Sequence, residues 1–260
     1  MSLASAAIIS RRDLLLLLVQ KELKIKYKGA VLGFFWSLLN PILMMIVYSV
    51  VFSVIVRFAM PRYPIFLLSG LLPWTAFLTA ITSSTTTIVG NAHLVRRVAF
   101  PIEFLPLTSV LTSLVNLLPS LGVLLLFAFF FRQPLGLPLL ALPLLLALQA
   151  LLTTGLALIL SAVTVYFRDV EYLVGIGLTV LFFMTPILYP LSVVGESSRL
   201  HLLLLLNPLT WLVTSYQRIW HDNQWPDLYQ LLMLTGMAVL AMIAGTLVFR
   251  RLEGRLAEEV

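Results

Sequence analysis

Apolar residues follow one another in long runs along this chain, and short polar segments separate the runs. A helix of about 20 mostly apolar residues crosses the hydrocarbon core of a bilayer. Six runs reach that length and predict six transmembrane helices, over residues 34–56, 65–89, 103–131, 137–167, 172–189 and 228–249. The sequence therefore indicates an all-α integral membrane protein.

A seventh apolar run, residues 200–213, is too short to span a membrane and is broken by Asn207-Pro208. Irregular backbone at membrane depth needs protein or water to satisfy its polar groups. We therefore expect a short re-entrant hairpin, residues 191–218, on the outer side before the last span.

The segment before the first span has the period of an amphipathic helix, which we expect over residues 11–30. One face carries Leu15, Leu16, Val19, Leu23 and Tyr27, and the opposite face carries Gln20, Lys21, Lys24 and Lys28. A basic amphipathic helix lies in the headgroup layer, where its lysines meet anionic lipid. A loop whose lysines extend to the headgroups is the alternative.

Composition agrees with a membrane protein. The 260 residues are 60% hydrophobic and 11% charged, with a mean hydropathy of +1.04, whereas soluble domains are about 25% charged. The chain has no cysteine, which excludes disulfides, thiolate metal sites and cysteine nucleophiles. His201 and His221 lie far apart and near no carboxylate cluster, so we expect no metal site.

Positive charge predicts the orientation. With the amino terminus inside, the outer side holds only Arg57, Arg62, Arg132, Arg199 and Arg218 of the 17 lysines and arginines. Cytoplasmic loops carry the excess of such residues. Both termini are therefore expected in the cytoplasm, and the net charge of +6 needs no nucleic-acid partner.

The source of energy follows from what the spans lack. Ion-driven transporters keep ionisable residues at mid-membrane, but all 11 acidic residues lie at or beyond the ends of the predicted spans. No G-x-x-x-x-G-K-[ST] loop occurs in the sequence, so the chain is not a P-loop ATPase. A separate ATPase that docks on a cytoplasmic loop fits both observations.

Five segments carry a resemblance to a known family. They are YKGAVLGFFWSLLNPI (27–42), NAHLVRRVAFPIEFLP (91–106), YFRDVEYLV (166–174), FFMTPILYP (182–190) and NPLTWLVTSYQR (207–218). In this order they resemble the signature segments of type-2 ABC transporter permeases for polysaccharide export, the group that includes O-antigen exporters of the Wzm type and teichoic acid and group 2 capsule exporters. The resemblance covers nearly the whole chain.

The resemblance implies one transmembrane domain over residues 1–260 that acts as a homodimer in the bacterial cytoplasmic (inner) membrane. The chain itself would have no cofactor and would not be an enzyme. ATP and magnesium would bind a separate nucleotide-binding subunit, and the cargo would be an undecaprenyl-pyrophosphate-linked polysaccharide such as O-antigen.

The same resemblance makes residues 91–101 a coupling helix against the ATPase. Its exposed face would hold Asn91, His93, Leu94, Arg96 and Arg97. Phe100 and Pro101 would turn the chain back into the third span, and a proline limits the length of the helix. The alternative is that Arg96 and Arg97 only anchor a cytoplasmic loop.

The substrate head group is expected near the start of the first span. Lys24, Lys26 and Lys28 lie at headgroup level, and Gly29 and Gly33 let the backbone approach a phosphate closely. The alternative is that the lysines only bind anionic lipid.

Aromatic rings suit a passage for sugars, because sugar C–H groups pack on ring faces. The candidates for the channel lining are Trp36, Tyr48, Phe52, Trp74, Phe182, Phe183 and Tyr189, and the resemblance adds Trp211 and Tyr216 as aromatics of an external gate. The hydroxyl run Thr82–Thr87 either lines the pore or bonds back to its own helix.

Two other functions remain open from the sequence. A type-2 ABC exporter of small lipophilic molecules shares the helix plan, and a membrane-embedded enzyme of glycan assembly belongs to another class. The enzyme would need a cluster of carboxylates, whereas this chain offers scattered single acids.

Overall fold

The computed structural model describes residues 11–28, 35–52, 60–96, 100–195 and 199–259. Every regular element in these residues is helical, which confirms the all-α prediction. Four helical segments are long and apolar enough to cross a membrane. They are α3 (Tyr63–Gly90), α5 (Phe104–Phe130), η3 (Leu137–Ala141) joined to α6 (Leu142–Tyr166), and α10 (Leu228–Glu259).

Two shorter helices occupy the places of the other expected spans. α2 (Phe35–Val50) has 16 residues and α7 (Val170–Phe183) has 14. The chain is thus a multi-pass membrane protein, and the six-span topology stays a prediction. The remaining elements are α1 (Arg11–Tyr27), α4 (Ala92–Val95), η4 (Leu191–Val193), α8 (Arg199–Leu206) and α9 (Pro208–Trp220).

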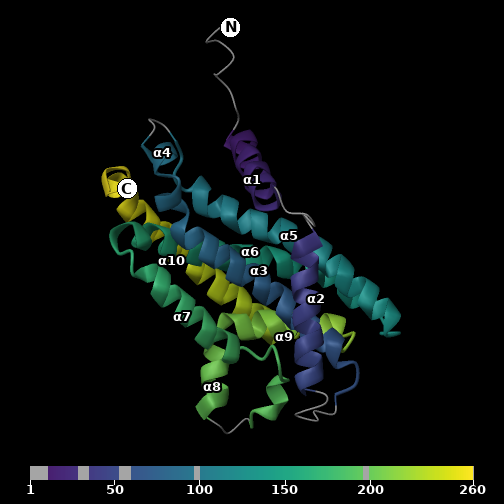
Figure 1. The fold of residues 1–260 in the computed structure, drawn as a ribbon. Helices are drawn as coiled ribbons and strands as arrows, with labels where there is room; N and C mark the ends of the chain where they lie inside the picture. Colours follow the sequence, from purple (N-terminus) through teal and green to yellow (C-terminus); the bar gives the residue numbers. More distant parts are fainter. Residues whose placement is uncertain (1–10, 29–34, 53–59, 97–99, 196–198, 260) are drawn as a thin grey trace.

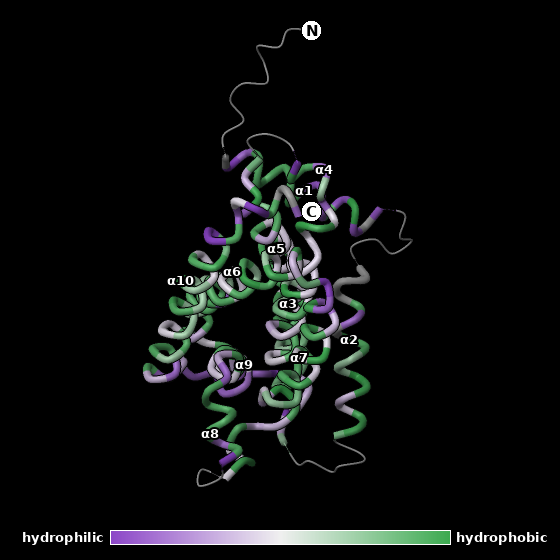
Figure 2. Tube along the Cα trace, turned by 90° about the vertical axis from the view of Figure 1, so that its left-hand side faces the viewer, coloured by the Kyte–Doolittle hydropathy of each residue, from purple (hydrophilic) through white to green (hydrophobic). Residues whose placement is uncertain are grey.

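The long helices pack side by side, and several of the short elements lie at the two ends of the bundle (Figure 1). α1, α4 and the carboxyl-terminal part of α10 lie at one end, called here the α4 end. η4 and α8 lie at the opposite end, the α8 end. Hydropathy follows this arrangement, because hydrophobic positions cover the long helices and hydrophilic ones collect toward the ends (Figure 2).

The core forms around α3 and α9. α3 packs against α2, α5, α6, α7 and α9. Every residue of α9 except Pro208 and Arg218 is buried, so this short helix is enclosed by protein. A helix that is buried on all sides is apolar all round or needs internal partners for its polar groups.

α8 and α9 meet at the break expected from Asn207-Pro208. The Asn207 side chain accepts a hydrogen bond from the Leu209 amide at 3.0 Å, which caps α9. Pro208, the first residue of α9, has no backbone N–H and therefore needs no acceptor at this position. The Asn207 amide group also donates to Thr185 Oγ1 at 2.9 Å and to the Met184 carbonyl at 3.3 Å. The cap of α9 therefore also satisfies the backbone where α7 ends.

Two further amide side chains donate to backbone carbonyls in the interior. Gln217 on α9 donates to the Pro186 carbonyl at 2.8 Å, beyond the end of α7. Gln149 on α6 donates to the Pro73 carbonyl at 3.0 Å, inside α3. The Tyr216 hydroxyl donates to Gln149 Oε1 at 3.1 Å. Together these bonds join α3, α6, α7 and α9 in the interior.

α6 and α10 approach each other at two glycines. A methyl group built on Gly245 would overlap the Gly155 carbonyl, and one built on Gly155 would overlap the backbone of Ala241. Small residues at a crossing let two membrane helices come into backbone contact. This close crossing of α6 and α10 thus depends on the absence of two side chains.

We predict that Gly245→Ala destabilises the protein, because the added methyl must push α10 away from α6. The free energy of unfolding should fall by about 1–3 kcal/mol, the usual cost of overpacking. The control is Gly236→Ala on the same helix, where a methyl group meets nothing within 4 Å. Thermal unfolding in detergent checks this, and equal melting temperatures for the two variants would contradict it.

Candidate functional site

A groove of about 420 Å³ lies between α2, α3 and α7. Four aromatic residues expected in a channel line it, namely Tyr48, Trp74, Phe182 and Phe183. Its polar lining consists of Asn40, Thr75, Thr82 and Thr179. Four of the seven aromatic residues that the sequence suggested for a channel lining thus lie together on this groove, and their role in a channel stays a prediction.

The rings of the groove form one continuous surface around Phe182. Its centroid lies 5.6 Å from Trp74, 6.3 Å from Tyr48 and 5.3 Å from Phe183. Phe182 and Phe183 are the last residues of α7, and Phe183 is 63% exposed. Ring faces offer weak contacts that a moving sugar exchanges easily.

The groove hydroxyls bond to their own helices. Thr82 Oγ1 donates to the Leu78 carbonyl at 2.8 Å, and Thr179 Oγ1 donates to the Gly175 carbonyl at 3.0 Å. Each hydroxyl oxygen keeps acceptor capacity for a ligand. Ser84 and Thr85 are buried and also bond back to α3, so half of the hydroxyl run bonds to its own helix.

Two expected gate aromatics are core residues in this structure. Trp211 is 5% exposed and donates from Nε1 to the Leu205 carbonyl at 2.9 Å. Tyr216 is fully buried against Gln149. Their rings pack α9 into the protein and do not line the groove, which corrects the expectation that they face a passage.

Two other expected channel aromatics, Phe52 and Tyr189, lie outside the groove lining. Phe52 stacks on Tyr63 with a centroid separation of 5.8 Å. Tyr189 is half-buried and donates to the Phe183 carbonyl at 3.0 Å, so it supports the end of α7. The side chain of Trp36 lies outside the described part of the chain.

α4 is a four-residue helix between α3 and α5, at the position of the expected coupling helix. Val95 is 3% exposed and packs in an apolar cluster. The cluster, called here the α4 cluster, consists of Ile88, Val95, Ile102, Leu105, Leu158, Ala162, Val165, Phe249 and Leu256. It joins α4 to α3, α5, α6 and α10.

Only part of the expected coupling face is exposed. His93 and Arg96 are exposed. Leu94 and Phe100 pack against the α4 cluster, and Pro101 is partly buried. Leu94 thus differs from the expectation because its apolar side chain anchors α4. Asn91 donates to the Thr87 carbonyl at 2.9 Å and joins α3 to α4; Arg97 lies outside the described residues.

This packing lets α4 transmit force. A close-packed cluster resists compression, so a displacement of α4 would also displace the ends of the four long helices that the cluster joins. Rigid-body displacement of packed elements is one established way in which proteins change conformation.

The three lysines expected to meet the substrate head group do not all lie on one surface. Lys24 and Lys28 line a shallow hollow of about 410 Å³ together with Lys21 and Gln20. Lys26 does not line it and lies one helical turn after Glu22. Burial raises the pKa of Glu22, and partial desolvation lowers the pKa of Lys26. Gly29 and Gly33 lie outside the described residues.

The apolar face of α1 also differs from the expectation. Val19 is buried, and α1 packs against α5. Leu16, which the helical period assigned to the same face, is 48% exposed. α5 therefore covers a narrower stripe than the pattern suggested.

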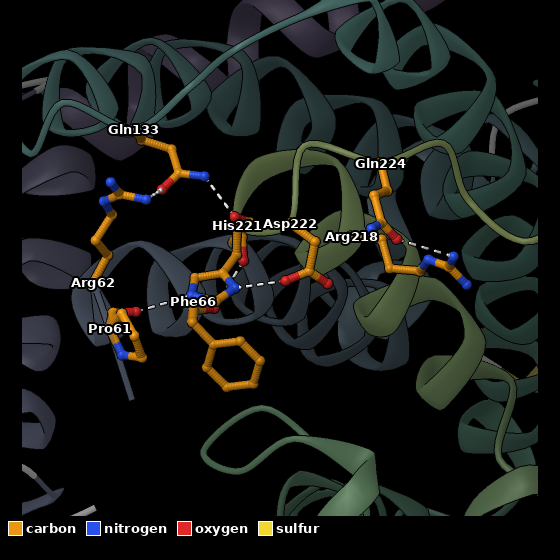
Figure 3. Close-up of polar contacts among 9 residues, drawn as sticks. Pro61, Arg62, Phe66, Gln133, Arg218, His221, Asp222 and Gln224 are labelled. Carbon is orange, nitrogen blue, oxygen red and sulfur yellow. Dashed lines mark hydrogen bonds and ion pairs between the residues drawn. The ribbon is translucent and has the colours of Figure 1, made fainter. Parts of the chain in front are cut away.

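A polar cluster at the start of α3 escaped the sequence analysis (Figure 3). Arg62 donates to Gln133 Oε1 at 3.3 Å, and Gln133 donates to the His221 carbonyl. His221 Nδ1 lies 2.8 Å from Asp222 Oδ1, and its Nε2 lies 3.0 Å from the Pro61 carbonyl. We call these five residues the clasp, because they join the ends of α3, α5 and α9.

Backbone strain gathers at the clasp. Among the described residues, the non-glycine residues with positive φ are Arg62, Arg132 and Asn223, with φ of 52°, 51° and 52°. Each lies in the clasp or beside one of its members. Strained backbone persists only where the surroundings determine it, so the clasp bonds hold three helix ends in fixed positions.

The clasp favours a charged histidine. The hydrogen bond to Asp222 and the bond to the Pro61 carbonyl raise the pKa of His221, against the opposing effect of burial. Both ring nitrogens face oxygen acceptors. Only the doubly protonated imidazolium can donate a hydrogen bond from both nitrogens at once. The adjacent pair His221-Asp222 was the only local signal in the sequence, because the other partners lie 88 and 160 residues away.

Comparison with known proteins agrees with the geometry. Residues 13–220 match the family model described as ABC-2 type transporter. The chain is 38% identical over 249 residues to the O-antigen export system permease protein RfbA of Myxococcus xanthus. The aligned residues cover 96% of each chain. It is 30% and 31% identical over 253 residues to two Klebsiella pneumoniae proteins of the same name, covering 95% of this chain and 94% of theirs.

The clasp predicts a pH dependence of stability. The pKa of His221 is raised in the folded protein. Protonated His221 therefore stabilises the folded state fully at a pH below the ordinary histidine pKa of about 6.5, and this stabilisation is lost as the pH rises through the pKa of the folded protein. Thermal unfolding of the purified protein across this range should show a melting temperature that falls with rising pH. In His221→Gln the melting temperature should depend less on pH. In His93→Gln, a change at an exposed position of α4, the melting temperature should fall with rising pH as in the wild type. An unchanged slope in His221→Gln would contradict the role of the clasp.

Proposed function

The chain belongs to the ABC-2 type transporter family, and from this premise we propose that it is the membrane subunit of an ATP-driven exporter of O-antigen. Membership of the family implies a partner ATPase subunit. The relatives that match along nearly the whole chain are named as O-antigen export permeases. ATP and magnesium would bind the partner, since this sequence has no P-loop.

The observation that carries the proposal is the aromatic groove. A polysaccharide must move through many positions without strong binding at any of them. Rings from α2, α3 and α7 supply an extended weak surface, and the hydroxyls of Thr75, Thr82 and Thr179 supply exchangeable hydrogen bonds. A groove rich in fixed charges would hold a glycan or an ion in one place instead.

We propose that two copies complete the passage. Apolar side chains on α2 and α7 beside the groove are exposed in the single chain, among them Met44, Val47 and Val180. A facing copy would cover part of this surface and close the groove into a channel. Two-fold symmetry is the commonest arrangement of identical subunits.

The cargo would enter at the α4 end. Three lysines of α1 share one hollow there, and clustered positive charge attracts the pyrophosphate of a lipid-linked glycan. We accordingly propose that α4 and both termini lie on the cytoplasmic side of the bacterial inner membrane. The undecaprenyl-pyrophosphate anchor is the proposed form of the cargo.

The ATPase would act on α4. His93 and Arg96 offer a polar contact, and Val95 ties the same helix to the α4 cluster. Asn91 and Arg97 would extend the contact, while Phe100 and Pro101 return the chain to α5. Closure of the ATPase would then move α3, α5 and α10 together.

A deletion strain tests the proposed function. Loss of the exporter should remove O-antigen from the cell surface while lipid-linked glycan accumulates inside, because synthesis continues. Extraction and quantification of the lipid-linked glycan measures this. A strain that makes no glycan at all would indicate an enzyme of assembly, and normal surface O-antigen would contradict the proposal.

The same strain tests coupling through α4. Arg96→Glu should fail to restore surface O-antigen, because it reverses the charge offered to the ATPase. Arg168→Glu, an equal change at an exposed position between α6 and α7, should restore it. The variant protein must still be present in the membrane. Restoration by Arg96→Glu would remove α4 from the coupling role.

A further inference from the structure

A second cavity, separate from the groove, lies between α5, α6 and α10 and has a volume of about 260 Å³. Its walls are mostly apolar and include Leu107, Leu158, Met242 and Phe249. Leu158 and Phe249 also belong to the α4 cluster. The cavity therefore adjoins the element that we assign to coupling, and its existence does not depend on which glycan is exported.

The cavity extends from headgroup level into the hydrocarbon layer. Arg250 is the first charged residue of α10 after the apolar stretch that begins at Leu228, so it marks the membrane surface. Met242, eight residues earlier on α10, lies about 12 Å deeper at about 1.5 Å per residue. A space of this length with apolar walls fits the upper part of one acyl chain.

Opposite charges flank the cavity at its surface end. Glu103 precedes α5 and is half-buried, and Arg250 on α10 is exposed. The ion pairs within 4.0 Å in the described part of the chain are Arg218–Asp227 and His221–Asp222. Glu103 and Arg250 thus line one cavity without forming a direct ion pair, and each can receive a charge from a ligand.

We propose that this cavity binds an aminophospholipid, with its ammonium group against Glu103, its phosphate against Arg250 and part of one acyl chain between α5, α6 and α10. The two charges fit a zwitterionic headgroup of the ethanolamine type. A headgroup with phosphate alone would satisfy Arg250 and leave Glu103 beside a negative charge. Glu103 therefore selects against anionic lipid.

The neighbouring helix crossing keeps the cavity in place. Thr154 and Thr246 line the cavity, and each stands next to one of the glycines, Gly155 and Gly245, at which α6 and α10 touch. Bound lipid would fill the space that opens beside this crossing. It would also join α5 to α10 next to α4 and stabilise the folded state by mass action.

Native mass spectrometry of the purified permease tests the site. The protein is incubated with an equal mixture of phosphatidylethanolamine and phosphatidylglycerol, and the retained lipids are counted. The wild type should prefer phosphatidylethanolamine. Glu103→Gln should lower this preference about fivefold, the size expected for one partly exposed ion pair, and Arg250→Gln should weaken retention of both lipids.

Two matched controls lie on the same helix outside the cavity. Glu253→Gln and Arg255→Gln make the same charge changes on α10, and neither residue lines the cavity. Both should behave like the wild type. Leu107→Trp fills the cavity without a change of charge and should reduce retention of phosphatidylethanolamine. Elution profile and melting temperature establish that each variant is folded.

Three results would overturn the proposal. One is equal retention of the two lipids by the wild type, and a second is an equal loss of preference in Glu103→Gln and Glu253→Gln. The third is retention of an isoprenoid-linked species in place of phospholipid. If Arg250→Gln does not fold, the wild-type preference and the Leu107→Trp result decide the question.

Discussion

Unpaired backbone carbonyls inside an apolar protein cost several kcal/mol each in a membrane environment, and in this chain three amide side chains donate to carbonyls in the interior. Asn207, Gln217 and Gln149 donate to the carbonyls of Met184, Pro186 and Pro73. The chain can therefore leave α7 after Phe183 and continue through the buried residues 185–188, and α9 can lie buried close to them. Because Phe182 and Phe183 close α7, these bonds also position two rings of the groove.

The ends of the bundle are held by different chemistry. At the α4 end an apolar cluster joins α4 to four long helices. Such packing would transmit a displacement through non-directional contacts and without charged groups. At the start of α3 the clasp joins three helix ends through polar bonds to a titratable histidine. α3 connects both, since it begins at the clasp and ends at α4. The groove lies against this helix, between the point where force would enter and the point that is held.

The sequence predicted elements better than contacts. Length and apolar runs indicated the long helices, and Tyr48, Trp74, Phe182 and Phe183 were proposed for a channel lining because aromatic faces suit sugars. The direction of a ring is not encoded in a run that is apolar on all sides, so Trp211 and Tyr216 were assigned to a gate although they pack in the core. Apart from the adjacent pair His221-Asp222, the hydrogen bonds from amide side chains to backbone carbonyls and the bonds of the clasp join residues 23 to 160 positions apart, and no local pattern indicates them. Lys24 and Lys28 share a face because they are four residues apart, and the same spacing rule places Lys26 elsewhere.

Access of water to the groove in the assembled transporter can be measured directly, because the chain has no cysteine of its own. A single cysteine at Thr179, in the groove, is compared with one at Ile243, an exposed position on α10 outside it. Membranes that contain the permease and its ATPase are treated with a water-soluble thiol reagent. If the groove is the wall of the export path, Thr179→Cys reacts and lipid-linked glycan slows its reaction, while Ile243→Cys stays unreactive. Equal and negligible reaction at both positions would mean that the groove faces lipid and that the glycan takes another route.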